Sequence, residues 1–326
     1  WKEKGMRTVM PDGKIRARGV AMAMQGSSIS NCDVGSVTVK LSDEGTYHIT
    51  VGCTDMGTGC DTIIAQFAAD VLETPIDNIS VYGVDTDISP YDSGSYASST
   101  TYLTGMAAVK ACEQLREHII ALAAARMNKD ASALTFDGEN VIDESDGSKM
   151  SLFDIATASM CNNEISMEVT YSHSSPVSPP PFMAACAEVE VDPETGAIEL
   201  LDYTACVDCG TVVNTNLARV QTEGGLLQGI GMTLYEDIWY DERGKNLSNS
   251  FMQYKIPSRL DVGEIRVEFE SSYEPTGPFG AKSIGEIVIN TPSPAISNAV
   301  QNAVGVIVRE LPITAEKVYK GMAEKE

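Results

Sequence analysis

Alternation of apolar and polar residues predicts two β-hairpins, one in each half of the chain. The first joins residues 36–41 and 46–51 through Ser-Asp-Glu-Gly. The second joins residues 187–191 and 197–201 around Asp-Pro-Glu-Thr-Gly. A period of two is typical of strands with one buried face, and short polar links containing Gly favour hairpin turns. Because each hairpin leads to a glycine-rich loop and then an apolar helix, we expect an α+β protein of two related subdomains.

Three loops rich in glycine or serine each precede a segment with helical spacing of apolar residues. They are residues 52–59 before a helix from Cys60, residues 93–101 before a helix from Tyr102 to Met127, and residues 280–286 before a helix that ends near Val304. Ser293 is the expected N-cap of the last helix, with Pro294 in its first turn. Because helix N-termini favour anions, the loops together predict a site for a large anionic cofactor. Ordinary turns that cap ordinary helices are the alternative for any one loop.

Prolines mark the expected boundary between the halves. Residues 174–181 contain four prolines, and successive prolines continue neither a helix nor a central strand. We therefore expect a linker or crossing segment here, with subdomains at residues 1–175 and 176–326. Polar residues 127–151 predict a surface insertion with turns at two Asp-Gly pairs.

Composition narrows the classes of function. The 326 residues include 23 Lys plus Arg and 46 Asp plus Glu, so the net charge is −23. Nucleic-acid binding and docking to anionic membranes need clustered basic residues, which this chain lacks. At 43% apolar residues, the chain can bury a sizeable core. No apolar run is long enough to cross a bilayer, and the first residues hold no apolar signal core, so we expect a cytoplasmic protein.

Cysteine spacing argues against a closed metal site or an iron–sulfur cluster. Of eight cysteines, only Cys206 and Cys209 form a C-x-x-C pair, and the chain has three histidines. A structural zinc site needs four ligands, and iron–sulfur clusters need four thiolates. We therefore predict free thiols and no metal-ligating side chain.

Six stretches, taken in order, resemble the molybdenum hydroxylase family, which includes xanthine dehydrogenases and aldehyde oxidoreductases. They are Gly52-Cys-Thr-Asp-Met-Gly-Thr-Gly59, Ala97-Ser-Ser-Thr100, Gln221-Thr-Glu-Gly-Gly-Leu-Leu-Gln-Gly229, Tyr254-Lys-Ile-Pro-Ser258, Gly280-Ala-Lys-Ser-Ile-Gly-Glu286 and Arg309-Glu-Leu-Pro-Ile-Thr314. The resemblance covers roughly residues 17–318 and depends on the ordered set rather than on any one motif. It implies the mixed sheet-and-helix molybdopterin-binding fold of that family.

The family's molybdopterin-binding subunit is normally much longer, so this chain resembles its C-terminal half. The split resembles that of nicotinate dehydrogenases, in which the length of this chain suits the medium molybdopterin subunit. The resemblance implies hydroxylation of an N-heterocycle, such as nicotinate to 6-hydroxynicotinate, with water as the oxygen source. A split xanthine or purine hydroxylase ranks second.

The resemblance also implies a cofactor and partners. The cofactor would be molybdopterin cytosine dinucleotide carrying molybdenum, with a terminal sulfido or selenido ligand. A large molybdopterin subunit would complete the site, and an iron–sulfur subunit and an FAD subunit would carry electrons away.

Residue roles follow from the same resemblance. Glu286 matches the general base beside molybdenum. The matching cofactor contacts are Gly57, Thr58, Gly59, Ala97, Ser98, Ser99, Thr100, Gln221 and Lys282. Thr58 stands where many relatives have Gln, and Ile287-Val288 stands where many have Pro-Pro.

Two other classes of function are alternatives. A bracing subunit would share the fold but leave catalysis to a neighbour, as the departures at Thr58 and Ile287-Val288 suggest. A serine hydrolase is disfavoured because residues around Ser98 do not form the G-x-S-x-G turn that exposes a nucleophile.

Overall fold

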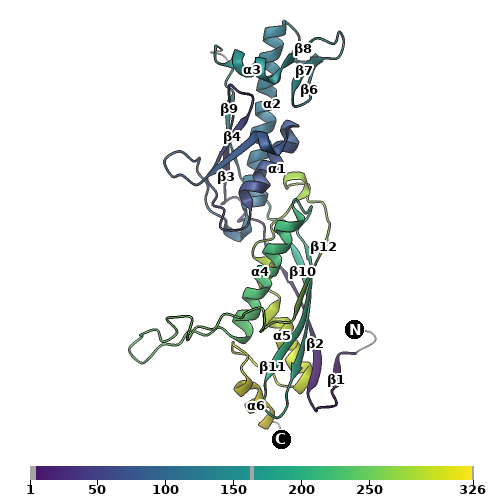
Figure 1. Ribbon diagram of the computed structural model, residues 1–326, viewed down its shortest axis with the longest axis vertical. Helices are drawn as coiled ribbons and strands as arrows, with labels where there is room; N and C mark the ends of the chain where they lie inside the picture. Colours follow the sequence, from purple (N-terminus) through teal and green to yellow (C-terminus); the bar gives the residue numbers. More distant parts are fainter. Residues whose placement is uncertain (1–4, 162–164, 325–326) are drawn as a thin grey trace. The chain divides into compact units, whose positions relative to one another are not determined.

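The computed structural model describes residues 5–161 and 165–324, which form two compact units (Figure 1). Unit 1 contains the chain up to Gln25, Pro180–Ser272, and the chain from Ile284 onward. Unit 2 contains Gly26–Pro179 and Tyr273–Ser283. Both units are discontinuous, whereas the expected subdomains are continuous halves. The expectation about a signal core falls partly on residues 1–4, which lie outside the described residues.

Unit 1 is a five-stranded sheet with helices. Its strand order is β1 (Arg7–Val9), β2 (Ile15–Met24), β10 (Phe182–Val191), β11 (Ile198–Asp208), β12 (Glu264–Glu270). Neighbouring strands are antiparallel except for the parallel pair β11 and β12. Its helices are α4 (Thr215–Leu234), the short η6 (Ile287–Ile289), α5 (Pro292–Val304) and α6 (Ala315–Ala323). The predicted second hairpin is confirmed as β10 and β11.

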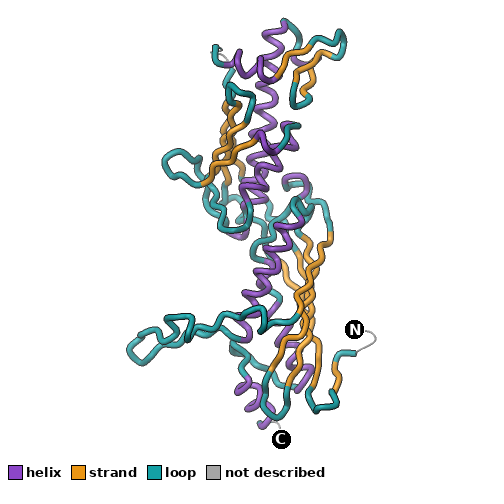
Figure 2. Tube along the Cα trace, viewed as in Figure 1, coloured by secondary structure: helices purple, strands orange, loops and turns teal. Residues whose placement is uncertain are grey.

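Small residues let helix α5 approach the unit 1 sheet closely. A Cβ added to Gly19 in β2 would lie 2.1 Å from the carbonyl oxygen of Ala295. Ala295 and Ala299 of α5 are buried against this part of the sheet. Residues 235–263, by contrast, are almost entirely loop and extend away from α4, as Figure 2 shows.

Unit 2 contains a four-stranded sheet, a small three-stranded sheet and helices. The larger sheet has the order β5 (Ile79–Gly83), β4 (Tyr47–Val51), β3 (Gly35–Leu41), β9 (Glu168–His173), and the smaller has β6 (Leu134–Phe136), β7 (Asn140–Asp143), β8 (Lys149–Ser151). The helices are α1 (Cys60–Leu72), η1 (Ile76–Asn78), η2 (Tyr96–Ser98), η3 (Thr100–Thr104), α2 (Gly105–Met127), η4 (Ala131–Ala133), α3 (Leu152–Ser159) and η5 (Pro278–Gly280). The first predicted hairpin is confirmed as β3 and β4. Among the described residues, no helix has the length and apolarity needed to cross a bilayer.

Two sequence predictions about local structure were wrong in part. The expected surface insertion is the small sheet, and its Phe136 and Val141 are buried in the core of unit 2. These strands were not predicted because their alternation of apolar and polar residues is short and lies among many polar residues. Helix α5 begins at Pro292 with Thr291 as N-cap, two residues before the expected cap. Proline at the first helical position sets this start, and the Ser293 hydroxyl instead lies 2.8 Å from that of Thr233.

Adjacent glycines in α4 provide a matched stability test. A Cβ at Gly225 would lie 2.1 Å from Cγ2 of the buried Val288, so we expect Gly225→Ala to destabilise unit 1 by about 1–3 kcal/mol. A Cβ at Gly224 would meet no atom within 4 Å, so Gly224→Ala is expected to stabilise by about 0.5–1 kcal/mol. Urea unfolding measures both free energies. Equal changes in the free energy of unfolding of the two variants would contradict close packing of α4 on η6, which contains Val288.

Candidate functional site

Asp55 closes the loop before α1. Its Oδ1 accepts hydrogen bonds from the N–H of Gly57 at 2.9 Å and of Gly59 at 3.0 Å. Both glycines have a positive φ, 102° and 77°, which side-chain-bearing residues rarely adopt. Gly59 is the N-cap of α1, so the loop delivers Thr58 to a helix N-terminus. The N–H groups of Gly57 and Gly59 are thus occupied by Asp55, and anion binding by this loop stays a prediction.

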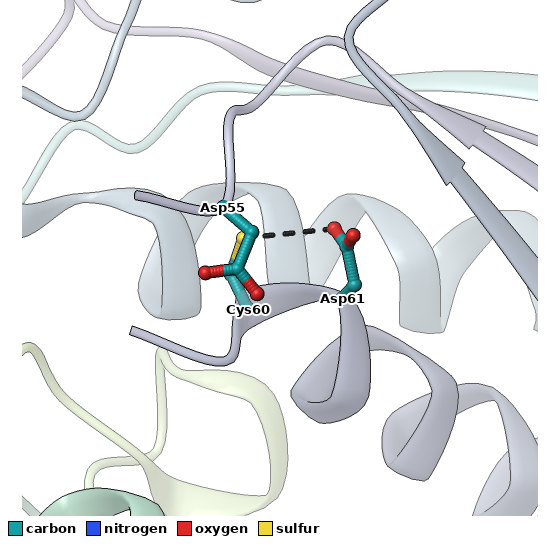
Figure 3. A group of neighbouring side chains, drawn as sticks. All are labelled: Asp55, Cys60 and Asp61. Atoms are coloured by element: carbon teal, nitrogen blue, oxygen red, sulfur yellow. Dashed lines mark hydrogen bonds between the residues drawn. The ribbon is translucent and has the colours of Figure 1, made fainter. Parts of the chain in front are cut away.

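A thiol and two carboxylates come together at the same place (Figure 3). The possible ligand atoms of Asp55, Cys60 and Asp61 lie within 4.8 Å of one another. The Cys60 thiol donates to Asp61 Oδ1 at 3.8 Å. Burial raises the pKa of Asp61, and the negative charge of Asp55 raises it further. Local hydrogen bonds account for the contacts of Asp55 and Cys60. We therefore infer that these three residues stabilise the conformation of the loop.

The second predicted loop contains backbone strain. Ala97 and Ser98 both have left-handed φ values, 48° and 59°. Such a residue other than glycine costs roughly 1–2 kcal/mol, and strain of this kind concentrates at functional sites. Hydrogen bonds hold the loop: the Ser95 and Thr100 hydroxyls lie 2.7 Å apart, and Ser99 donates to the Gly94 carbonyl at 3.3 Å. The π-helical turn η3 follows, and π turns are also frequent at functional sites.

Close packing brings the first two loops together within unit 2. A Cβ at Gly52 would lie 2.3 Å from the Pro90 carbonyl oxygen and 2.7 Å from Cβ of Asp92. Asp92 in turn accepts a hydrogen bond from the Thr104 hydroxyl at 2.9 Å, which ties the second loop to η3. Glycine at position 52 is therefore required for the first loop to meet the segment that leads directly into the second.

The segment 273–283 joins the same unit. The buried Tyr102 hydroxyl lies 2.7 Å from the Thr276 hydroxyl and 3.0 Å from that of Ser175. The rings of Phe67 and Phe279 stack with centroids 5.8 Å apart. Lys282 is only 6% exposed, so it is not a solvated surface lysine.

Glu286 lies in unit 1, on the loop before η6. Its Oε2 accepts a hydrogen bond from Gln25 Nε2 at 2.9 Å. The other end of the Gln25 amide, Oε1, accepts from Asn290 Nδ2 at 3.2 Å. Because Asn290 fixes which end of the Gln25 amide faces Glu286, the carboxylate has a defined N–H donor. Glu286 is exposed.

Gln221 holds the backbone of the same loop. Its Nε2 donates to the Gly285 carbonyl at 3.0 Å. Gly225 and Gly229, further along α4, allow the helix to lie against Val288 and Pro292, where any Cβ would collide. The glycine-rich stretch that begins at Gln221 is therefore a packing surface for the Glu286 loop. Ile287 and Val288, which follow Glu286, are buried in the hydrophobic core of unit 1.

The structure thus gathers the predicted residues into two groups. Unit 2 holds Gly57, Thr58, Gly59, Ala97, Ser98, Ser99, Thr100 and Lys282, and unit 1 holds Gln221 and Glu286. Sequence reasoning missed Gln25 and Asn290. Gln25 lies 261 residues from Glu286 along the chain, and no local pattern joins positions so far apart.

A family model described as "Molybdopterin cofactor-binding domain" matches residues 1–263. The chain is 37% identical over 310 residues to "Probable hypoxanthine oxidase XdhD" of Escherichia coli K12, covering 94% of this chain and 32% of that protein. It is 30% identical to the "6-hydroxypseudooxynicotine dehydrogenase complex subunit gamma" of Paenarthrobacter nicotinovorans, covering 98% of this chain and 41% of that subunit. The chain therefore spans less than half the length of these relatives.

Solved structures show the same fold. Quinoline 2-oxidoreductase from Pseudomonas putida 86 superposes with a TM-score of 0.86 at 26% identity, covering 96% of this chain and 42% of that chain. The Cu,Mo-CO dehydrogenase superposes with a TM-score of 0.85 at 25% identity, covering 95% and 41%. These matches confirm the predicted α+β class and the mixed sheets with helices.

Replacing Gln221 tests how the Glu286 loop is held. Gln221→Met keeps the length of the side chain but removes the N–H donor to Gly285, so we expect a loss of about 1 kcal/mol. Hydrogen–deuterium exchange should become faster in residues 284–290. Gln228→Met, at an exposed position of the same helix, is the control and should leave exchange unchanged. Unchanged exchange in both variants would mean that Gln221 does not restrain this loop.

Proposed function

This chain belongs to the molybdopterin-binding domain family of xanthine dehydrogenases and aldehyde oxidoreductases, and we propose that it is the medium molybdopterin subunit of a multi-subunit molybdenum hydroxylase. Its substrate would be an N-heterocycle, hydroxylated with oxygen from water in the cytoplasm. The observation that supports this most strongly is the Glu286 carboxylate, held by Gln25 on a loop that Gln221 fixes.

The residues of unit 2 fit an anionic pterin dinucleotide. Phosphate groups need N–H and hydroxyl donors, and net positive charge is not required when these donors are preorganised. The α1 N-terminus after Gly59 offers backbone N–H groups. Ser98 and Thr100 add hydroxyls on a strained loop. We propose that these residues hold molybdopterin cytosine dinucleotide, and that Lys282 adds positive charge.

Glu286 would act as the proton acceptor of the reaction. The bound molybdenum cofactor would supply the acidified water and accept the electrons. Glu286 Oε1 would take the proton while Oε2 keeps the hydrogen bond from Gln25. The hydrogen bond from Gln25 would hold the carboxylate in place for this role. A proton acceptor of this kind typically contributes 10²–10⁴-fold to a rate, on the order of magnitude found for general bases.

The class of substrate is supported by the names of several relatives. "Nicotine 6-hydroxylase large subunit" of Paenarthrobacter nicotinovorans is 31% identical to this chain, and the quinoline enzyme shares its fold. We propose nicotinate, converted to 6-hydroxynicotinate, as the first substrate to test. A purine is the second candidate, because the hypoxanthine oxidase relative has the higher identity, 37%.

Partners follow from the length of the chain relative to its relatives. A large molybdopterin subunit would supply the part that this chain does not span, while iron–sulfur and FAD subunits would carry electrons. The terminal ligand of molybdenum would be sulfido or selenido. A bracing subunit without a catalytic residue is the alternative. The hydrogen-bonded placement of Glu286 argues against it.

Glu286→Gln in the assembled enzyme tests the proton acceptor. The amide keeps the size of the side chain but cannot take a proton, so turnover should fall by about 10²–10⁴-fold. Elemental analysis should find the same molybdenum content as in the parent enzyme. The control is Glu223→Gln, a carboxylate on α4. Near-normal turnover of the Glu286 variant would favour the bracing role.

Steady-state kinetics of the assembled enzyme can separate the substrates. We expect kcat/KM for nicotinate to exceed that for hypoxanthine by at least about tenfold, the factor that 1.4 kcal/mol of transition-state binding gives. The reverse ratio would identify a purine hydroxylase. Hydroxylation of neither compound, in a preparation that contains molybdenum, would exclude both assignments.

A further inference from the structure

One face of the unit 1 sheet carries exposed apolar side chains. Successive residues of a strand point to opposite faces, so Ala17, Gly19 and Ala21 of β2 face α5. The alternate residues Met22 and Met24 face the other side and are 79% and 69% exposed. Figure 1 shows α4 and α5 on the side of the sheet opposite to this face.

The register of the strands defines the extent of this surface. Met24 pairs with Phe182, Met22 with Ala184, and Val20 with Cys186 across β2 and β10, and Ala184 pairs with Cys206 of β11. We call this surface the open face; its residues are Val20, Met22, Met24, Phe182, Ala184, Cys186 and Cys206. All of them are exposed or half-exposed. Contiguous exposed apolar patches of this kind mark protein interfaces, and methionine adapts well to a partner surface.

The charged side chains on the rest of the same sheet face already form ion pairs with one another. Arg16 lies 2.7 Å from Glu190, and Arg18 lies 2.6 Å from Glu188. Arg266 pairs with Asp202. Charged groups that neutralise one another in this way need no partner, so the requirement for a covering partner is confined to the apolar half.

We infer that the open face is the docking surface for the polypeptide that corresponds to the part of the relatives that this chain does not span. This inference rests on the proposed function, because that polypeptide would be the large molybdopterin subunit. The chain spans 32–41% of two relatives' length, so most of their folded mass lies outside it.

Charge selects this occupant over a second copy of the chain. Glu268 and Glu270 of β12 are exposed beside Cys206 and Asp208 on the same side of the sheet. A second copy would bring its own acidic edge and its net charge of −23 to an equally acidic surface. Like charges across an interface suppress pairing. The partner should accordingly present an apolar centre with a basic rim on the β12 side.

Photo-crosslinking in the assembled enzyme tests the inference. Met22→p-benzoylphenylalanine, placed in this chain and coexpressed with its companion subunits, should give an adduct with the large molybdopterin subunit. Met160→p-benzoylphenylalanine is the control, since Met160 is 67% exposed and belongs to unit 2, whereas the open face belongs to unit 1. An adduct with a second copy, or no adduct from position 22, would overturn the inference.

A charge at the same position gives an independent measurement. Met22→Asp should leave urea unfolding of the isolated chain unchanged, because the side chain is exposed. It should weaken binding of the large subunit roughly 100-fold, the scale expected when an interface buries an unpaired charge. Met22→Leu is the conservative control and should bind normally. Equal binding by both variants would overturn the inference.

Molybdenum analysis separates this inference from the proposed function. If the crosslink forms but the assembled enzyme contains no molybdenum, the proposed function fails and the docking surface stands. If molybdenum is present and the crosslink is absent, the docking surface fails and the proposed function stands.

Discussion

The hydrogen bond between Gln25 and Glu286 is the constraint on which the account of the site depends. A free glutamate on an exposed loop samples many rotamers, and fixing it costs conformational entropy. Here Asn290 orients the Gln25 amide, and the amide orients the carboxylate. Gln221 fixes the backbone one residue earlier. The ordering is thus achieved by folding, before any ligand binds, which is how preorganised catalytic groups gain their effect.

Close packing around glycine makes this arrangement possible. Gly225 and Gly229 let α4 lie against the loop, and Gly19 lets α5 lie against the sheet whose strand β2 leads to Gln25. In unit 2, Gly52 has the same role for the loops around Gly57 and Ala97. The glycines therefore act less as flexible hinges than as gaps that allow neighbouring segments to pack closely.

The sequence predicted the elements with a strong local pattern. The hairpins β3–β4 and β10–β11 have regular alternation, and α1 has regular helical spacing. It did not predict β2, where alanines alternate with larger residues and give little contrast in hydrophobicity. It could not predict that Gln25 reaches Glu286, because the contact joins positions 261 residues apart and no local pattern links them. Glu286 itself was found through resemblance to a family motif, since composition alone does not single out one glutamate.

Anomalous diffraction at the molybdenum absorption edge, measured on crystals of the assembled enzyme, tests the central claim most directly. The account predicts a molybdenum peak within about 3–5 Å of a Glu286 carboxylate oxygen, which is hydrogen-bonding reach of an intervening oxygen atom. The Gln25 amide should remain on the other carboxylate oxygen. A peak far from Glu286, or a Glu286 side chain directed into bulk solvent, would contradict the account.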